Sequence, residues 1–573
     1  MTERRYAWRV VALTLGVFAI WAGLGVRLAL LHLGRNDSLR AQIDRTRHVE
    51  RTLQGPRGRI MDREGNIMAL DLAVKNVVAD PKVIHEKNQV SLVGRYLTHL
   101  LDVPPAVVYS KLQRKHRRYE LIKPRARDEE IQDLERMKLT GVYFQDTNAR
   151  NYPLGKMMCH IVGFANREGV GSAGVELEMN KYLRGRAGLR VGQKDGRRRE
   201  IYTRRNLEIE PQPGADVYLT IDQKVQYFVE KALDAAMEEH SAKGAWAIVE
   251  RVSTGEILAM AVRPAYDLNE FGTTPLLRQR NEAVGNVYEP GSTLKGPVLA
   301  AALNEGVIRP EDIIDCEKGC WYFGGKPLRD YHAYDRLSMA DVLKKSSNIG
   351  TAKIALKLGN RRVHDYLEAF GLGARTGIDL PGEEAGILHN VSKWSKISIT
   401  RVAMGHEVSV TALQMLNAFC GIANGGFLMR PYVVQRVIGS DGTELVSNEP
   451  TVMGRPIRPE TARLMCELLG RVSEDGGTAR RARVEGYKVA GKTGTATKPI
   501  PGGYSSTDHM ASFVGFLPAD RPEVGIIVVV DTPQPKHTGG VVAAPIFREI
   551  AEQAVRYLDI PSSSSWEAMA QQR

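Results

Sequence analysis

Residues 288–295 read YEPGSTLK, and this stretch decides how the larger part of the chain is interpreted. Its Pro-Gly pair breaks regular structure immediately before Ser292, and the apolar residues 297–303 continue as a helix. Ser292 is therefore predicted to open a helix, with Lys295 one turn later on the same face. Burial disfavours a charged amine, so a neutral Lys295 could accept the Ser292 proton and create a strong nucleophile. The alternative is a helix-capping serine followed by a solvated lysine.

A second motif, Ser346-Ser347-Asn348, lies between two helical patterns at residues 339–345 and 349–358. A short loop between helices is expected there. Such a loop could aim the Ser346 hydroxyl at the leaving-group nitrogen, where it would pass a proton. It could also aim the Asn348 amide at a substrate carbonyl or at Lys295. Helix capping is the alternative role for both side chains.

A third motif, Lys492-Thr493-Gly494-Thr495, follows the start of a short apolar strand. The Lys492 cation and the Thr493 hydroxyl suit a substrate carboxylate, and Gly494 leaves room for substrate to lie against the strand. The backbone N–H groups of Ser292 and Thr495 can form an oxyanion hole. An edge strand that uses glycine for its twist is the alternative.

Each motif alone is weak evidence, because S-x-x-K occurs by chance in many chains of this size. Together, their order and their contexts form the signature shared by β-lactamases and penicillin-binding proteins. This signature predicts acyl transfer through a serine, with no cofactor and no metal ion.

Length and composition set the limits of the interpretation. A chain of 573 residues is too long for one core, so two or three folded units are expected. The 43% hydrophobic and 25% charged residues are typical of globular proteins. The net charge of +13 suits an acidic partner, but it does not choose among nucleic acid, anionic lipid and anionic wall polymer.

The five cysteines are scattered, and their odd number cannot form a complete disulfide framework. Only Cys316 and Cys320 lie close together in sequence. This C-x3-C pair lacks the second ligand pair of a structural zinc site, so a disulfide or two thiols remain, and thiols are favoured.

An apolar segment near the N-terminus is long enough to cross a membrane. Residues 10–26 read VVALTLGVFAIWAGLGV, and residues 28–33 extend the run beyond Arg27. A cleaved signal peptide ranks second, because the run is too long and no A-x-A site follows it. The N-terminal flank of this segment carries Arg4, Arg5 and Arg9, and its C-terminal flank carries Arg35, Arg40 and Arg45. Charge therefore favours a cytoplasmic N-terminus only weakly.

The pattern of the remaining chain indicates an α+β region followed by a second domain. A strand pattern at residues 216–222 and an amphipathic helix at 223–240 mark its start. Two hairpins follow, one at residues 245–262 and one at 511–530. Strands at both ends with helices between them suggest one sheet that is closed by its termini and covered by helices.

Two polar segments carry no predicted site. The basic stretch at residues 188–206 is typical of a solvated hairpin, and residues 561–573 of a flexible tail.

With these motifs, nearly the whole chain resembles the class B penicillin-binding proteins. Other stretches similar to that family are 57–65 (RGRIMDREG), 150–153 (RNYP), 174–176 (GVE), Leu183 with Gly185, 410–414 (VTALQ), and Gly539-Gly540 with 544–547 (APIF). The resemblance implies a peptidoglycan D,D-transpeptidase that acts on the D-Ala-D-Ala ends of stem peptides and is inhibited covalently by β-lactams. It implies a β-lactamase-like fold with a central antiparallel sheet, and no nucleic-acid partner.

The predicted division of the chain follows from the same resemblance. It comprises a cytoplasmic N-terminus (1–9), a transmembrane anchor (10–33), a non-catalytic α+β pedestal or dimerisation domain (34–215), a transpeptidase domain (216–560) and a tail (561–573). The bulk of the chain is expected on the extracytoplasmic side of the cytoplasmic membrane, with a single pass.

The subclass and its partners are also expectations from resemblance. The pedestal lacks a glycosyltransferase motif such as E-D-x-x-F, which argues against a bifunctional class A enzyme. The Gly-Gly-x-x-Ala-Ala-Pro ending is more similar to the division type (FtsI-like) than to the elongation type. A SEDS-type glycosyltransferase, FtsW-like or RodA-like, and divisome proteins are the expected partners. Glu407 stands where related proteins often carry a second glycine, which leaves the shape of that loop open.

Three other classes of protein share the trio of motifs. A β-lactamase needs rapid deacylation and no pedestal or anchor, and a β-lactam sensor would carry several membrane spans and a cytoplasmic effector. A non-catalytic scaffold would be free to lose the reactive side chains, all of which are present.

Overall fold

The computed structural model describes residues 2–33, 48–193 and 207–563. The predictions for residues 194–206 of the basic stretch and for residues 564–573 of the tail lie outside these ranges. The chain forms two compact units, residues 1–55 with 186–212 and residues 56–185 with 213–573. Each is described by itself.

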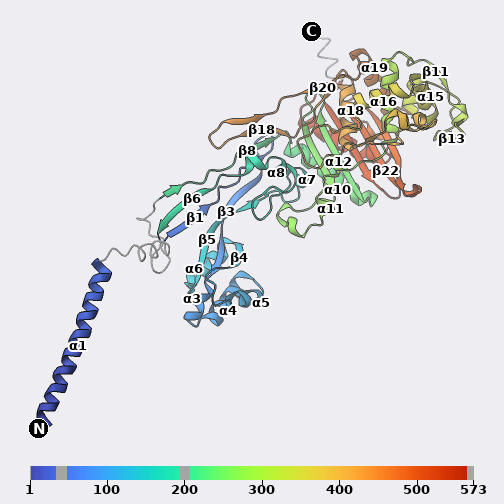
Figure 1. Cartoon of the computed structure of the whole chain (residues 1–573). Helices are drawn as coiled ribbons and strands as arrows, with labels where there is room; N and C mark the ends of the chain where they lie inside the picture. The colour runs from blue at the N-terminus through green and yellow to red at the C-terminus, as the bar shows by residue number, and fades with distance from the viewer. Residues whose placement is uncertain (1, 34–47, 194–206, 564–573) are drawn as a thin grey trace. The chain divides into compact units, whose positions relative to one another are not determined.

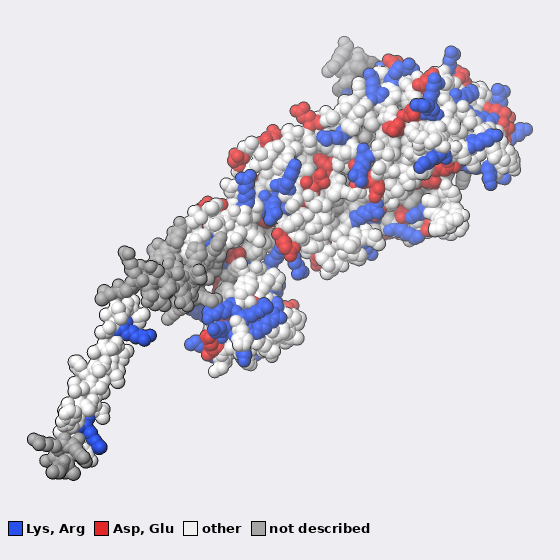
Figure 2. Space-filling model, in the orientation of Figure 1, with Lys and Arg blue, Asp and Glu red and all other residues white. Residues whose placement is uncertain are grey.

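The first unit contains the apolar segment and a small sheet. Helix α1 (Thr2–Leu33) includes a stretch, Tyr6–His32, that is long and apolar enough to cross a membrane. The side chains of residues 6–32 are exposed, and in Figure 2 this part of the helix is white except for a few basic groups. The antiparallel sheet consists of β1 (His48–Leu53), β6 (Gly188–Gln193) and β7 (Leu207–Ile209).

The second unit begins with the α+β part of the chain (Figure 1). Its strands are β2 (Ile60–Met61), β3 (Ile67–Ala79), β4 (Glu120–Ala126) and β5 (Val142–Asn151). Its helices are α3 (Pro81–Glu86), α4 (Val90–Leu101), α5 (Pro105–Leu112), α6 (Asp128–Met137), α7 (Cys159–Val162), α8 (Gly174–Glu178) and α9 (Asn180–Leu183). Helices α3 to α6 share a separate small core with β3 and β4.

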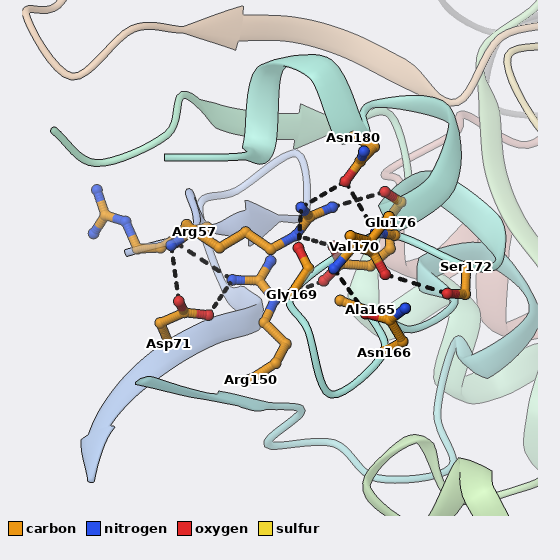
Figure 3. A network of polar contacts seen from close by, with 12 residues as sticks. Arg57, Asp71, Arg150, Ala165, Asn166, Gly169, Val170, Ser172, Glu176 and Asn180 are labelled. Carbon is orange, nitrogen blue, oxygen red and sulfur yellow. Dashed lines mark hydrogen bonds and ion pairs between the residues drawn. The ribbon is translucent and has the colours of Figure 1, made fainter. Parts of the chain in front are cut away.

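A buried charge network holds this part together (Figure 3). The Glu176 side chain is fully buried and receives Arg57 Nε at 2.5 Å and Arg150 Nε at 2.6 Å. Asp71 binds the Arg150 guanidinium at 3.2 Å and accepts a hydrogen bond from the Arg57 backbone N–H at 2.8 Å. Two cations therefore face two carboxylates, and a buried carboxylate needs such compensation. The network joins three of the stretches that resemble the family.

Strand β8 (Asp216–Leu219) lies at the predicted domain boundary and has neighbours on both sides of it. It pairs in parallel with β2 and antiparallel with β18 (Val434–Ile438). The sheet order is β19–β18–β8–β2–β3–β4, with β19 at Glu444–Ser447 and β5 paired to β3. The two parts of the second unit therefore share one sheet.

The larger part is built on a five-stranded antiparallel sheet in the order β10–β9–β23–β22–β21. The strands are β9 (Gly244–Arg251), β10 (Ile257–Arg263), β21 (Ala490–Ile500), β22 (Gly503–Leu517) and β23 (Val524–Asp531). Strand β9, from the start of the domain, pairs with β23, from its end. The predicted sheet, closed by its termini and covered by helices, is confirmed.

Helices cover this sheet and carry the site. Helices α10 (Gln223–His240) and α20 (Ala543–Tyr557) pack against it together, and α18 (Ala412–Ala423) packs against β9, β22 and β23. The helical middle contains α11 (Leu276–Gln279), α12 (Glu282–Gly285), α13 (Lys295–Asn304), α14 (Met339–Lys345), α15 (Asn348–Leu358), α16 (Asn360–Ala369), α17 (Ser398–Val402) and α19 (Pro459–Gly470). The hairpin of β12 (Cys320–Phe323) and β13 (Lys326–Arg329) precedes α14. Cys316 and Cys320 are free thiols, as favoured from the sequence.

Candidate active site

Ser292 lies in a tight turn at the start of a helix, as the sequence predicts. A 3-10 turn (Gly291–Leu294) leads directly into α13. Gly291 has φ +55°, and a Cβ there would lie 3.0 Å from the carbonyl oxygen of Thr495. The strand that carries Thr495 therefore runs directly beside the turn of Ser292.

Lys295 is fully buried and surrounded by oxygen atoms. Its Nζ donates to the Ser346 carbonyl at 2.6 Å, to Ser346 Oγ at 3.2 Å and to Asn348 Oδ1 at 2.7 Å. Burial lowers the pKa of Lys295 to about 7, although the negative charge of Asp330 opposes the shift. A lysine with this pKa is partly neutral at neutral pH.

The expected hydrogen bond between Ser292 and Lys295 is not made among the described residues. Three oxygen atoms already accept from Nζ, and a protonated amine has no lone pair that could accept the Ser292 hydroxyl. Loss of one proton would free that lone pair.

Ser346 stands between two lysines. It occupies the left-handed position at the end of α14, with φ +59°. Its Oγ accepts from Lys492 Nζ at 2.9 Å as well as from Lys295. Lys492 is fully buried, and burial together with the Lys295 charge places the pKa of Lys492 well below its usual value. The structure therefore brings Ser346 within hydrogen-bonding distance of one lysine from each of the other two motifs.

The third motif lies on β21, which is at the edge of the five-stranded sheet. Thr493 Oγ1 bonds Thr478 Oγ1 at 3.1 Å, and Thr495 Oγ1 accepts the Gly539 N–H at 3.0 Å. A Cβ on Gly494 would lie 2.9 Å from the Pro290 carbonyl oxygen. The glycine thus allows the strand to approach the turn before Ser292.

Asp330 belongs to this site but was missed from the sequence. Its Oδ1 accepts the Asn348 N–H at 2.5 Å and the Ile349 N–H at 3.0 Å, and its Oδ2 accepts from Ser347 Oγ at 2.6 Å. An anion at this position satisfies the first free N–H groups of α15. The segment after β13 carries no sequence signal for this contact.

Glu407, in the loop whose shape the sequence left open, has a left-handed backbone with φ +58°. Its side chain is exposed, and its N–H donates to Glu289 Oε1 at 3.0 Å. Glycine adopts this conformation most readily. The loop keeps that conformation with a glutamate.

Comparisons with known proteins agree with this geometry. Residues 245–552 match the penicillin binding protein transpeptidase domain, and residues 52–219 match the penicillin-binding protein dimerisation domain. The chain is 31% identical over 566 residues to the probable peptidoglycan D,D-transpeptidase PenA of Neisseria meningitidis, covering 98% of this chain and 95% of the relative. It is 31% identical over 559 residues to the peptidoglycan D,D-transpeptidase FtsI of Escherichia coli K12, covering 97% and 92%.

Solved structures give the same result. Penicillin-binding protein 2X of Streptococcus thermophilus is similar with a TM-score of 0.74 and 25% identity, over 90% of this chain and 82% of that one. Penicillin-binding protein 3 of Mycobacterium tuberculosis, in complex with aztreonam, has a TM-score of 0.69 and 25% identity, over 90% and 98%.

Proposed function

Because this chain belongs to the class B penicillin-binding proteins and is a serine-type peptidoglycan D,D-transpeptidase, we propose that Ser292 is its nucleophile and that it works in septal wall synthesis. The convergence of Lys295, Ser346 and Lys492 beside the Ser292 turn carries the first part of the proposal.

The proposed reaction begins with the neutral form of Lys295. Its lone pair takes the Ser292 proton as the oxygen attacks the carbonyl carbon of the penultimate D-alanine. The backbone N–H groups of Ser292 and Thr495 stabilise the oxyanion. Thr493 and Gly494 hold the substrate along β21, where its terminal carboxylate faces Lys492.

Collapse of the tetrahedral intermediate breaks the peptide bond. Ser346 Oγ donates its proton to the departing D-alanine nitrogen and regains one from a neighbouring lysine, which its two ammonium contacts support. The Asn348 amide holds Lys295 and a substrate carbonyl. The acyl-enzyme then reacts with an acceptor amine of a second stem peptide, which completes the cross-link.

Mass spectrometry of the protein after exposure to a β-lactam tests this assignment. We expect one adduct on the peptide that contains Ser292, slow release of the adduct, and no labelling of Ser292→Ala. Rapid turnover of penicillin would instead indicate a β-lactamase. An adduct on another serine would refute the assignment.

The septal role rests on the similarity to FtsI and PenA over nearly the whole chain. Depletion of the protein in its host should produce filaments, with an FtsW-like glycosyltransferase as the copurifying partner. Rounded cells and a RodA-like partner would support the elongation role.

The proposed topology has α1 as a single membrane anchor and the remainder outside the cytoplasmic membrane. Protease added to intact spheroplasts should digest the large domain. Its survival behind a sealed membrane would contradict this topology.

A further inference from the structure

Three hydrogen bonds converge on Glu289, three residues before Ser292. The Glu289 side chain is only 9% exposed. It accepts from His406 Nδ1 at 2.7 Å, from the Glu407 N–H at 3.0 Å and from Tyr504 Oη at 3.1 Å. One carboxylate therefore joins the Ser292 turn, the loop at 405–407 and the hairpin of β21 and β22.

The three segments are also in direct backbone contact. The Gly291 N–H donates to the Gly405 carbonyl at 3.2 Å, and Gly291 lies against the Thr495 carbonyl. The rings of His406 and Tyr504 meet edge to face, with centroids 5.8 Å apart. The charged groups that act on Tyr504 are Glu289, Glu407 and Arg401.

The tip of the β21–β22 hairpin, around Tyr504, lies beyond the contacts that hold the base of the hairpin. Strand β22 pairs with β23 only through residues 510–517; before them it pairs with β21 alone, through His509 and, after an irregularity, through Tyr504 and Gly503. Such a two-stranded ribbon is marginally stable by itself. Nearer the base, Lys498 binds Asp531 at 2.6 Å, Asp508 binds Lys243 at 2.9 Å, and the His509 ring stacks on that of His537. Tyr504, next to the turn at its tip, supplies the tie to the Ser292 turn.

We propose that Glu289, His406 and Tyr504 are positioning residues that hold strand β21 against the turn of Ser292. They do not touch the reacting atoms. They fix the distance between the Ser292 turn and the Thr495 backbone, on which the oxyanion contact depends. The inference rests on the proposed function, because it assigns these residues to the acylation of Ser292.

The test uses the full-length protein and a fluorescent penicillin. Tyr504→Phe removes one hydroxyl and keeps the ring, so we expect the melting temperature to stay within about 2 °C. A hydrogen bond to a charged group is typically strong enough that its loss should lower the acylation rate constant about tenfold. Tyr322→Phe is the matched control, since Tyr322 is 68% exposed and lies on β12; its rate should equal that of the wild type.

A double-mutant cycle separates positioning from general destabilisation. Glu289→Gln and Tyr504→Phe should each slow acylation, and the double variant should be little slower than the worse single variant, because both remove the same tie. Stopped-flow kinetics measures two quantities separately: the dissociation constant of the initial noncovalent complex with penicillin, and the rate constant of acylation.

Two results would overturn the inference: a Tyr504→Phe variant that acylates at the wild-type rate, or effects that multiply independently in the double variant. Failure of the proposed function has a different signature, since the wild type itself would then remain unlabelled at Ser292.

Discussion

At the scale of single residues, the pKa of Lys295 gives the most direct prediction. Burial lowers that pKa to about 7, so the neutral fraction rises with pH through this value. If Lys295 is the base, wild-type acylation should accelerate between about pH 6 and pH 8. Stopped-flow rates across this range are the measurement, and a flat profile would remove Lys295 as the base.

Substitution of the same lysine tests whether acylation requires Lys295 to accept a proton or only to carry a positive charge. Arginine stays positive but cannot deprotonate in a protein. The acylation rate constant of Lys295→Arg should therefore be at least about 10²–10⁴-fold lower than that of the wild type, which is the usual contribution of a general base. Lys357→Arg, at an exposed position on α15, is the control. Substantial activity in Lys295→Arg, with a normal melt, would mean that the lysine acts only as a cation.

Glu250, on β9, concerns stability instead of catalysis. It is fully buried, neither carboxylate oxygen has a hydrogen-bond partner among the described residues, and burial raises the pKa of Glu250 to about 8. Between pH 4.5 and 8 the unfolded state has lost this proton while the folded state keeps it, so stability falls as pH rises.

Glu250→Gln removes that dependence on pH. Relative to the wild type, the variant should gain stability between pH 5 and pH 8, by an amount on the order of a few kcal/mol. Urea midpoints at the two pH values measure the gain. An equal difference between variant and wild type at both values would show that Glu250 is not protonated in the folded protein.

Single residues also mark where sequence-based prediction ends. Ser292, Lys295, Ser346 and Lys492 were predicted as one site because each motif has a chemical pattern of its own. Asp330 was not, because its role arises only when the segment after β13 folds back onto the start of α15. Nothing in its neighbours in sequence requires that contact.

At the scale of elements, β21 depends on the small size of Gly494. A methyl group there would lie 2.9 Å from the Pro290 carbonyl oxygen and closer still to Ser512 Oγ. Gly494→Ala should push the strand away from the Ser292 turn and slow acylation at least about tenfold, since small displacements at a reacting centre cost heavily. Gly454→Ala, where a Cβ meets nothing within 4 Å, is the control. Equal rates in the two variants would contradict this account of β21.

Elements were predicted best where their side chains are patterned. The helix expected at residues 223–240 is α10 with the same bounds, because Asp222 caps it and an apolar face follows. The strand expected at 511–517 begins instead at Gly503. Its first half is largely polar and exposed and is held by backbone pairing to β21, which leaves no apolar pattern to detect.

At the scale of the whole molecule, the shared sheet predicts what a truncated chain would do. Removal of residues 1–215 would strip β8 of its neighbour β2 and would take away Asp62, which accepts the Gln223 N–H at 3.3 Å. The fragment should therefore melt below the full chain. All proposed catalytic groups lie between residues 292 and 495, so the folded fragment should still acylate. A folded but unreactive fragment would show that the α+β part shapes the site.

The pairing of β9 with β23 has a consequence for biogenesis. The central sheet joins a strand that ends at Arg251 to one that begins at Val524, so it cannot close until almost the whole polypeptide has been synthesised. At ordinary rates of synthesis the first strand waits on the order of tens of seconds for its partner. During that interval Ser292 and Lys295 have already been synthesised, but the sheet that would bring them together is incomplete. A ribosome that stops before residue 524 would therefore release an inert chain, with its nucleophile present and unable to react.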